Sequence, residues 1–149
     1  MNYQELLSAL DQMKQAKKGF NAITFPFFMR FVSQMKQTLA IPAHCLIQCH
    51  KRTNENCAVI EDCVSTHEGV STLQLELIID TDKLGITLQL QKSETKVLRL
   101  HVSTCGQQSD FYFPATSHVE SFSFADVYQF IYDTMLARYR RLQTSYEIN

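Results

Sequence analysis

The sequence contains few of the residues that interrupt regular structure, with only four glycines and three prolines in 149 residues. So few glycines and prolines mean few forced turns, and they leave no flexible linker or low-complexity segment. Hydrophobic residues make up 45% of the chain and charged residues 19%, which is ordinary for a globular protein. We therefore expect residues 1–149 to form a single domain.

Long hydrophobic segments are also missing. No apolar run approaches the roughly 18 to 20 residues that a membrane-spanning helix needs. The first residues, MNYQELLSALDQMKQ, form a polar, helix-like segment without the apolar centre of a signal peptide. Both absences predict a cytoplasmic protein that makes no contact with a membrane.

Neither sign of charge is in excess, because 14 basic and 15 acidic side chains leave a net charge of -1. A protein without a basic field is not expected to bind nucleic acid or an anionic membrane surface. The basic clusters around Lys17 and Arg140 fall near the expected ends of helices, where cations also favour the helix dipole. We expect no nucleic-acid partner.

The familiar sequence motifs of catalysis are absent as well. The chain has no G-x-S-x-G nucleophile turn, no H-E-x-x-H zinc motif and no glycine-rich phosphate loop. This absence predicts a protein that is not an enzyme and that uses no cofactor.

Hydrophobic spacing near the start of the chain predicts a helix over residues 2–17. Leu6, Leu10 and Met13 recur at intervals of three and four residues, which is typical of one face of a helix. Two lysines followed by Gly19 predict the end of this helix, since cations and a following glycine are common there.

A second helix is predicted over residues 24–39. Thr24 is a suitable N-cap and Pro26 is tolerated in the first turn of a helix, while Pro42 would prevent the helix from continuing. The first forty residues are thus expected to contain two N-terminal helices.

From residue 43 to residue 113 the hydrophobic period changes from 3.6 to 2, which predicts a sheet. The short connections predict antiparallel neighbours, and hence a meander of about five to six strands. The predicted strands are residues 43–50, 57–64, 72–79, 86–91, 96–103 and 110–113.

A long C-terminal helix is predicted from Ser123, where Asp126 would complete a capping box. Its apolar residues share one face, so we expect the helix to lie across the apolar side of the sheet, giving an α+β fold. The residues of that face are Phe124, Val127, Tyr128, Ile131, Met135, Tyr139 and Leu142.

Seven potential ligands of a soft metal fall within residues 44–67. They are His44, Cys45, Cys49, His50, Cys57, Cys63 and His67. A hairpin with His50 opposite Cys57 would place His44 opposite Cys63, about 20 Å away at about 3.3 Å per residue, so one ion could not bind both pairs. We expect five reduced, structural cysteines and no metal, and a metal or redox role is the alternative.

The outward positions of the predicted strands and one aromatic of the last helix are the candidate partner-binding residues. A polar sheet face with few charges suits a protein partner, and the alternative is simple exposure to water, which is normal for one face of an antiparallel sheet. Phe130 falls outside the main apolar stripe of its helix. Packing against the N-terminal helices is the alternative explanation for Phe130. The candidates are Gln74, Glu76, Gln89, Gln91, Arg99, His101, Tyr112 and Phe130.

These features together predict a cytosolic binding module that occludes or escorts another protein, as a toxin-neutralising immunity protein, an adaptor or a secretion chaperone does. The alternative is a small-molecule- or metal-binding protein, or an enzyme, that uses cysteine and histidine near a pocket between sheet and helix. A homodimer formed by pairing of edge strands, through residues 110–113 or 43–50, is a further possibility.

Overall fold

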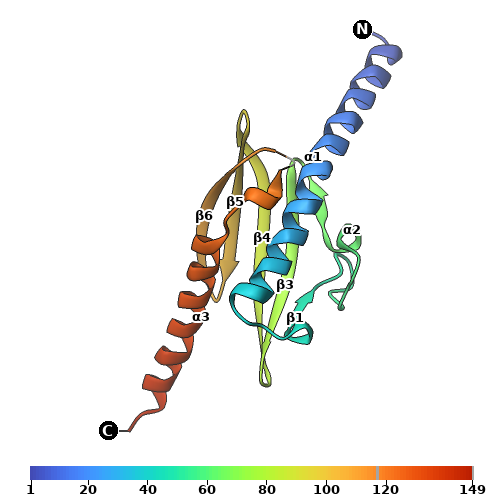
Figure 1. The fold of residues 1–149 in the computed structure, drawn as a ribbon. Helices are drawn as coiled ribbons and strands as arrows, with labels where there is room; N and C mark the ends of the chain where they lie inside the picture. The colour runs from blue at the N-terminus through green and yellow to red at the C-terminus, as the bar shows by residue number, and fades with distance from the viewer. Residues whose placement is uncertain (117, 149) are drawn as a thin grey trace.

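The computed structural model describes residues 1–116 and 118–148, and over these it contains two long helices and a six-stranded antiparallel sheet (Figure 1). The helices are α1 (Tyr3–Thr38), α2 (Ile60–Cys63) and α3 (Ala125–Tyr146). The strands are β1 (Leu46–Gln48), β2 (Ser65–His67), β3 (Val70–Ile79), β4 (Asp82–Glu94), β5 (Val97–Thr104) and β6 (Gln107–Pro114). None of the described helices is long and apolar enough to span a bilayer.

The predicted α+β architecture with an antiparallel, largely meandering sheet is confirmed. The strand order is β1-β3-β4-β5-β6, and β2 pairs with the same strand, β3, as β1 does. Consecutive strands from β3 to β6 are joined by tight turns. Between β5 and β6 the turn residues Cys105 and Gly106 both have positive φ, at 49° and 78°, as a type I′ hairpin turn requires. Such short turns fix the register of the sheet.

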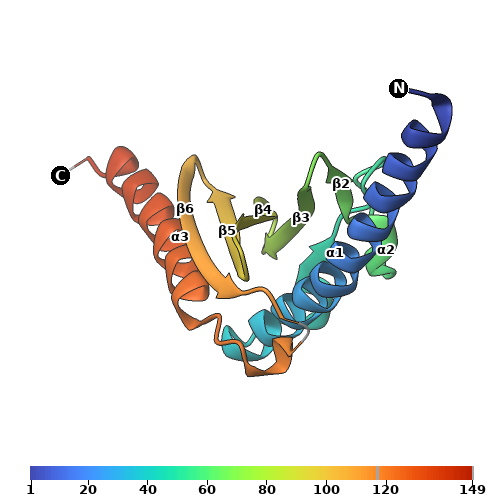
Figure 2. The same cartoon turned by 90° about the horizontal axis from the view of Figure 1, so that it is seen from above.

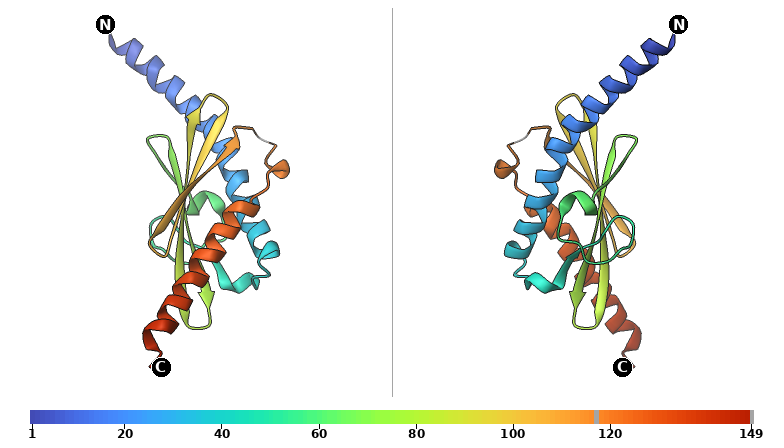
Figure 3. Two further views of the ribbon diagram at one scale, coloured as in Figure 1. Left: turned by 90° about the vertical axis from the view of Figure 1, so that its left-hand side faces the viewer. Right: turned by 90° about the vertical axis from the view of Figure 1, so that its right-hand side faces the viewer.

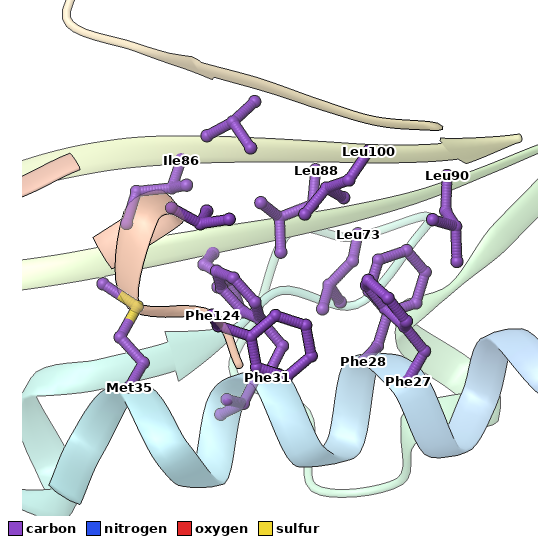
Figure 4. Packing of buried hydrophobic residues seen from close by; sticks show 14 of the residues in the cluster. Phe27, Phe28, Phe31, Met35, Leu73, Ile86, Leu88, Leu90, Leu100 and Phe124 are labelled. Carbon is purple, nitrogen blue, oxygen red and sulfur yellow. The ribbon is translucent and has the colours of Figure 1, made fainter. Parts of the chain in front are cut away.

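Both long helices pack on one face of the sheet and leave the other face uncovered (Figures 2 and 3). Side chains of α1 and the residue before α3 point toward alternate residues of the strands (Figure 4). The fully buried residues labelled there are Phe27, Phe28, Phe31, Met35, Leu73, Ile86, Leu88, Leu90, Leu100 and Phe124. The predicted apolar alternation of the strands therefore forms the sheet's half of the core.

Phe27 lies at the centre of an aromatic cluster that joins distant parts of the chain. Its ring centroid lies 5.2 Å from that of Phe124, 5.3 Å from Phe113, 5.8 Å from Phe28 and 5.9 Å from Phe122. The rings meet edge to face, which is a favourable arrangement of aromatic quadrupoles. This cluster holds α1, β6 and the start of α3 together.

The prediction of two N-terminal helices is wrong, because α1 continues through both expected interruptions. Gly19 and Pro26 lie inside the helix, and Thr24 is a fully buried helical residue rather than an N-cap. A glycine costs a helix about 1 kcal/mol and an interior proline about 3 kcal/mol. Full burial of Phe27 and Phe28 in the same turn is worth roughly 1.5–3 kcal/mol each and offsets that cost.

We expect Pro26→Ala to raise the free energy of unfolding by about 1–3 kcal/mol. Alanine restores the backbone donor that proline lacks within α1, and it removes the clash of the ring with the preceding turn. Urea denaturation followed by circular dichroism measures the change. If residues 2–17 and 24–39 were separate helices with Pro26 in a first turn, the same substitution would have little effect or would be destabilising.

The predicted hairpin of residues 43–50 and 57–64 is also wrong. Residues 57–64 end in the single turn α2, and among the described residues the only bridge there joins Cys49 to Asn56, one residue before the predicted second strand. The reason is that β3 is ten residues long, so one of its edges accommodates two short strands end to end. There β1 pairs with residues 75–77 and β2 with residues 70–72.

At the C-terminus, α3 begins two residues later than predicted and without a capping box. The Ser123 hydroxyl accepts a hydrogen bond from the backbone N–H of Ala125 at 3.4 Å, and no side-chain cap is formed at Phe124. The first half of α3 is buried against the sheet as expected, whereas its last turns project beyond the sheet (Figure 1), where Leu142 is exposed.

Candidate binding surface

Seven of the eight candidate residues lie together on the uncovered face of the sheet. The register of β3 to β6 places them at positions that alternate with the buried leucines, so their side chains point away from α1 and α3. We call this surface the open face. Its candidate residues are Gln74, Glu76, Gln89, Gln91, Arg99, His101 and Tyr112.

One row across the open face combines aromatic and cationic side chains. Gln91, Arg99 and Tyr112 are direct neighbours on β4, β5 and β6. Tyr112 is 60% exposed, and the Nε of Arg99 is enclosed without a hydrogen-bond partner. Tyrosine and arginine are enriched at protein interfaces, and here they lie side by side.

The next row contains His101, whose ring is held by two neighbours on β6. Its Nδ1 lies 2.6 Å from Oδ1 of Asp110 and its Nε2 lies 3.0 Å from Oε1 of Gln108. Since both ring nitrogens are engaged, neither is available for a metal ion or a substrate proton unless one of these contacts breaks. The geometry favours a fixed contact residue over a general base.

A third row crosses all four strands from β3 to β6. Gln74, Thr87, Ser103 and Gln108 are cross-strand neighbours, and the Thr87 hydroxyl donates to Oε1 of Gln74 at 2.8 Å. Hydrogen bonds between side chains thus restrain the open face before any partner binds. A restrained surface loses less side-chain entropy on binding.

Phe130 lies on the other side of the molecule from the seven residues of the open face. It is partly buried on α3, and its ring centroid is 6.0 Å from that of Phe111 on the covered side of β6. Its neighbour is therefore the sheet, whereas the sequence had suggested the N-terminal helices as the alternative. The spacing of apolar residues along α3 could not reveal this contact, because it does not show how the helix is rotated about its axis when it packs on the sheet.

Three of the five cysteines, Cys49, Cys57 and Cys63, lie close together beside the bridge between Cys49 and Asn56. Cys63 donates from Sγ to the carbonyls of Val59 at 3.2 Å and Cys57 at 3.6 Å. Burial, with hydrogen bonding to Cys57, raises the pKa of Cys63 to about 12, and burial also raises the pKa of Cys49. Thiols held neutral are poor nucleophiles and poor metal ligands.

The seven potential metal ligands of residues 44–67 do not converge. Across residues 1–116 and 118–148, no group of three or more His, Cys, Asp or Glu side chains is placed to hold a metal ion. His67 is highly exposed on β2, and the His50 ring accepts from the backbone of its own loop.

The structure also contains an apolar groove that the hydrophobic pattern of the sequence does not predict. Its volume is about 400 Å³, and it forms where the end of α1, the end of β3 and the middle of α3 meet. Because it joins three segments far apart in sequence, periodicity within one segment could not predict it. The groove is lined by Leu39, Ala40, Ile41, Pro42, Cys45, Leu77, Ile78, Ile79, Ile131, Tyr132 and Met135.

Comparisons with known proteins give no relative from which a function could be inferred. No family model matches the chain, and neither a curated protein nor a solved structure matches it. Any inference about function therefore has to come from the surfaces themselves.

Proposed function

We propose that this protein is a non-enzymatic binding module that docks on another protein through the open face. Binding would either cover a functional surface of the partner, as an immunity protein does, or escort the partner, as an adaptor or secretion chaperone does. The observation that carries the proposal is the uncovered face of four adjacent strands, with polar side chains hydrogen-bonded between β3 and β4 and between β5 and β6.

The dimensions of the open face support this proposal. Four strands about 4.8 Å apart and about eight residues long give a surface of roughly 14 Å by 26 Å. A stable interface buries about 800 Å² on each partner, so this surface with its projecting side chains supplies the centre of one. Occlusion requires shape and hydrogen bonds and no reactive group.

The chemistry of the face favours a protein partner over a nucleic acid. Amides of Gln89 and Gln91 donate and accept hydrogen bonds, and neutral groups cost less than charged ones to remove from water. The open face carries the carboxylates of Glu76 and Asp110 as well as the guanidinium of Arg99, so it lacks the basic excess that phosphate binding requires.

The test is affinity purification of the tagged protein from its source lysate, repeated with matched tyrosine variants. A partner that binds through the open face should be retained by the wild type and weakened about tenfold or more by Tyr112→Ala. Tyr132→Ala is the control, since Tyr132 is 51% exposed on α3 and lies away from the open face. Binding that is insensitive to Tyr112→Ala would contradict the proposal.

A second candidate is binding of a small apolar molecule in the groove beside Cys45. The groove falls within the roughly 300–1,000 Å³ typical of ligand pockets, and its lining is almost wholly apolar. The same two variants distinguish the candidates. Loss of a bound ligand or partner on Tyr132→Ala, with retention on Tyr112→Ala, would favour the groove.

A further inference from the structure

The first part of α1 extends into solvent as a free helical arm. Every residue from 1 to 19 is exposed, and α1 runs past the end of the sheet before it reaches the core (Figures 1 and 3). We call residues 3–19 the arm, which at 1.5 Å per residue is about 25 Å long. An isolated helix of this length is only marginally stable in water, so an uncovered arm is an unfavourable arrangement.

One side of the arm carries an apolar stripe. The exposed fractions are 70% for Tyr3, 68% for Leu6, 40% for Leu7, 43% for Leu10 and 52% for Met13. A helix that faces only water has no physical reason to align large apolar residues in this way.

The stripe of the arm continues the face of α1 that is buried in the core. Spacings of three and four residues run without a break from the exposed part to the buried part, so the arm presents the face that packs on the sheet further along. The residues of this series are Leu6, Leu10, Met13, Lys17, Phe20, Thr24, Phe27 and Phe31. Such spacing is typical of a seam between two helices.

The charges of the arm are separated along its length. Glu5 and Asp11 lie in its first part, whereas Lys14, Lys17 and Lys18 lie in its second part. Among the described residues, Asp11 and the three lysines take part in no ion pair. An arm of this kind is complementary to a copy of itself that runs in the opposite direction, and a parallel copy would bring the lysines together.

We infer that the arm pairs with the arm of a second copy of this chain, antiparallel and about a two-fold axis. The two arms are aligned so that Leu10 of one copy lies beside Met13 of the other. Leu6 of each copy then lies against the aliphatic part of Lys17 of the other copy. Asp11 and Lys14 of the two copies meet on the same flank of the seam. The same patch serves on both copies, so the contact closes as a dimer rather than continuing as a fibre.

The size of the contact fits a dimer of moderate stability. The five apolar residues of the stripe and the stem of Lys17 supply the centre, and the stems of Lys14 and Lys18 cover its edges, as lysine stems do beside helical seams. Stable interfaces bury about 800 Å² per copy, and a single pair of helices about 25 Å long lies at the lower end of that class. We expect a dissociation constant of about 1 μM, within reach of sedimentation measurements.

The test is sedimentation equilibrium of the full-length chain over a range of concentrations. We expect the wild type to dimerise and the double variant Leu6→Glu with Leu10→Glu to dissociate at least ~100-fold more readily. Both residues are exposed, so circular dichroism should show an unchanged fold. Met29→Glu is the matched control, because Met29 is 56% exposed on the same helix and lies outside the arm.

Charge variants test the antiparallel pairing. An arm made predominantly acidic by Lys14→Glu and Lys18→Glu, with Lys17 kept in the apolar series, and an arm made wholly basic by Glu5→Lys and Asp11→Lys, should each dimerise poorly. An equimolar mixture of the two should form heterodimers.

A monomeric wild type would overturn the inference, and so would a dimer that survives the leucine substitutions, since that dimer would use another surface such as an edge strand. Equal loss of dimer in Met29→Glu would overturn it too, because the effect would not belong to the arm. A mixture of the charge variants that stays monomeric would contradict the antiparallel pairing.

Discussion

Replacement of Phe27 by alanine is expected to lower the free energy of unfolding by about 3–5 kcal/mol. Phe27 is fully buried, and its ring meets four other aromatic rings from three parts of the chain. Alanine would leave a cavity that the surrounding strands and helices cannot close without moving together. Urea denaturation monitored by circular dichroism measures the loss.

Phe25→Ala provides the control for this prediction. Phe25 lies two residues earlier on α1 and is only partly buried against the core, so its loss should cost markedly less. If the two variants were equally destabilised, the aromatic cluster would not be the centre of the core. A large effect at Phe25 and a small one at Phe27 would mean that α1 is rotated relative to the sheet.

Stability is expected to fall at alkaline pH, from about pH 9 because of Cys63 and more steeply from about pH 10 because of Tyr128. Its hydroxyl is buried and donates to the carbonyl of Phe31 at 2.7 Å. Burial raises the pKa of Tyr128 well above 10.0, its ordinary value, and that of Cys63 from 9.0 to about 12. Both groups are therefore neutral in the folded chain at a pH where they ionise in the unfolded chain.

The direction in which stability changes with pH follows from this difference in pKa between the folded and the unfolded chain. The unfolded chain loses the tyrosine proton above pH 10.0 and the folded chain keeps it, so the stabilisation is complete below that pH and declines above it. The decline due to one such group is about 1.4 kcal/mol per pH unit. Cys63 adds to the decline in the same direction, beginning near pH 9.0.

Tyr128→Phe separates this contribution from that of the other groups. The variant should be about 1 kcal/mol less stable near pH 7, because it loses one hydrogen bond, and it should show a shallower decline above pH 10. Free energies of unfolding at a series of pH values between 7 and 11 measure both effects. An unchanged slope would mean that the Tyr128 hydroxyl ionises equally well in the folded chain.

The sequence could predict those elements whose form is decided locally. The alternation of Leu73, Leu75 and Leu77 with polar residues identified β3, and the same rule placed the seven open-face residues on one side. Alternate side chains of a strand point to opposite faces of the sheet. A strand that is predicted in the correct register therefore also assigns each of its side chains to the buried or to the exposed face.

Elements decided by distant contacts could not be predicted in this way. Gly19 and Pro26 are ordinary helix breakers, and α1 continues past them because strands some fifty residues away bury the phenylalanines beside Pro26. Likewise, residues 57–64 carry a strand-like pattern but end in α2, because β1 and β2 already occupy the edge of β3. The groove and the orientation of Phe130 depend on how α3 docks, which no local pattern records.

The contact between Tyr128 and Phe31 spans 97 residues of sequence. Hairpins from β3 to β6 form between neighbours and can assemble as soon as they leave the ribosome, whereas the two helices that cover them come from opposite ends of the chain. During synthesis the leucine-rich side of the sheet is thus half covered until α3 emerges. Any species in which the hairpins have formed but α3 has not yet docked exposes part of the leucine-rich side of the sheet to aggregation, and docking of α3 ends that exposure.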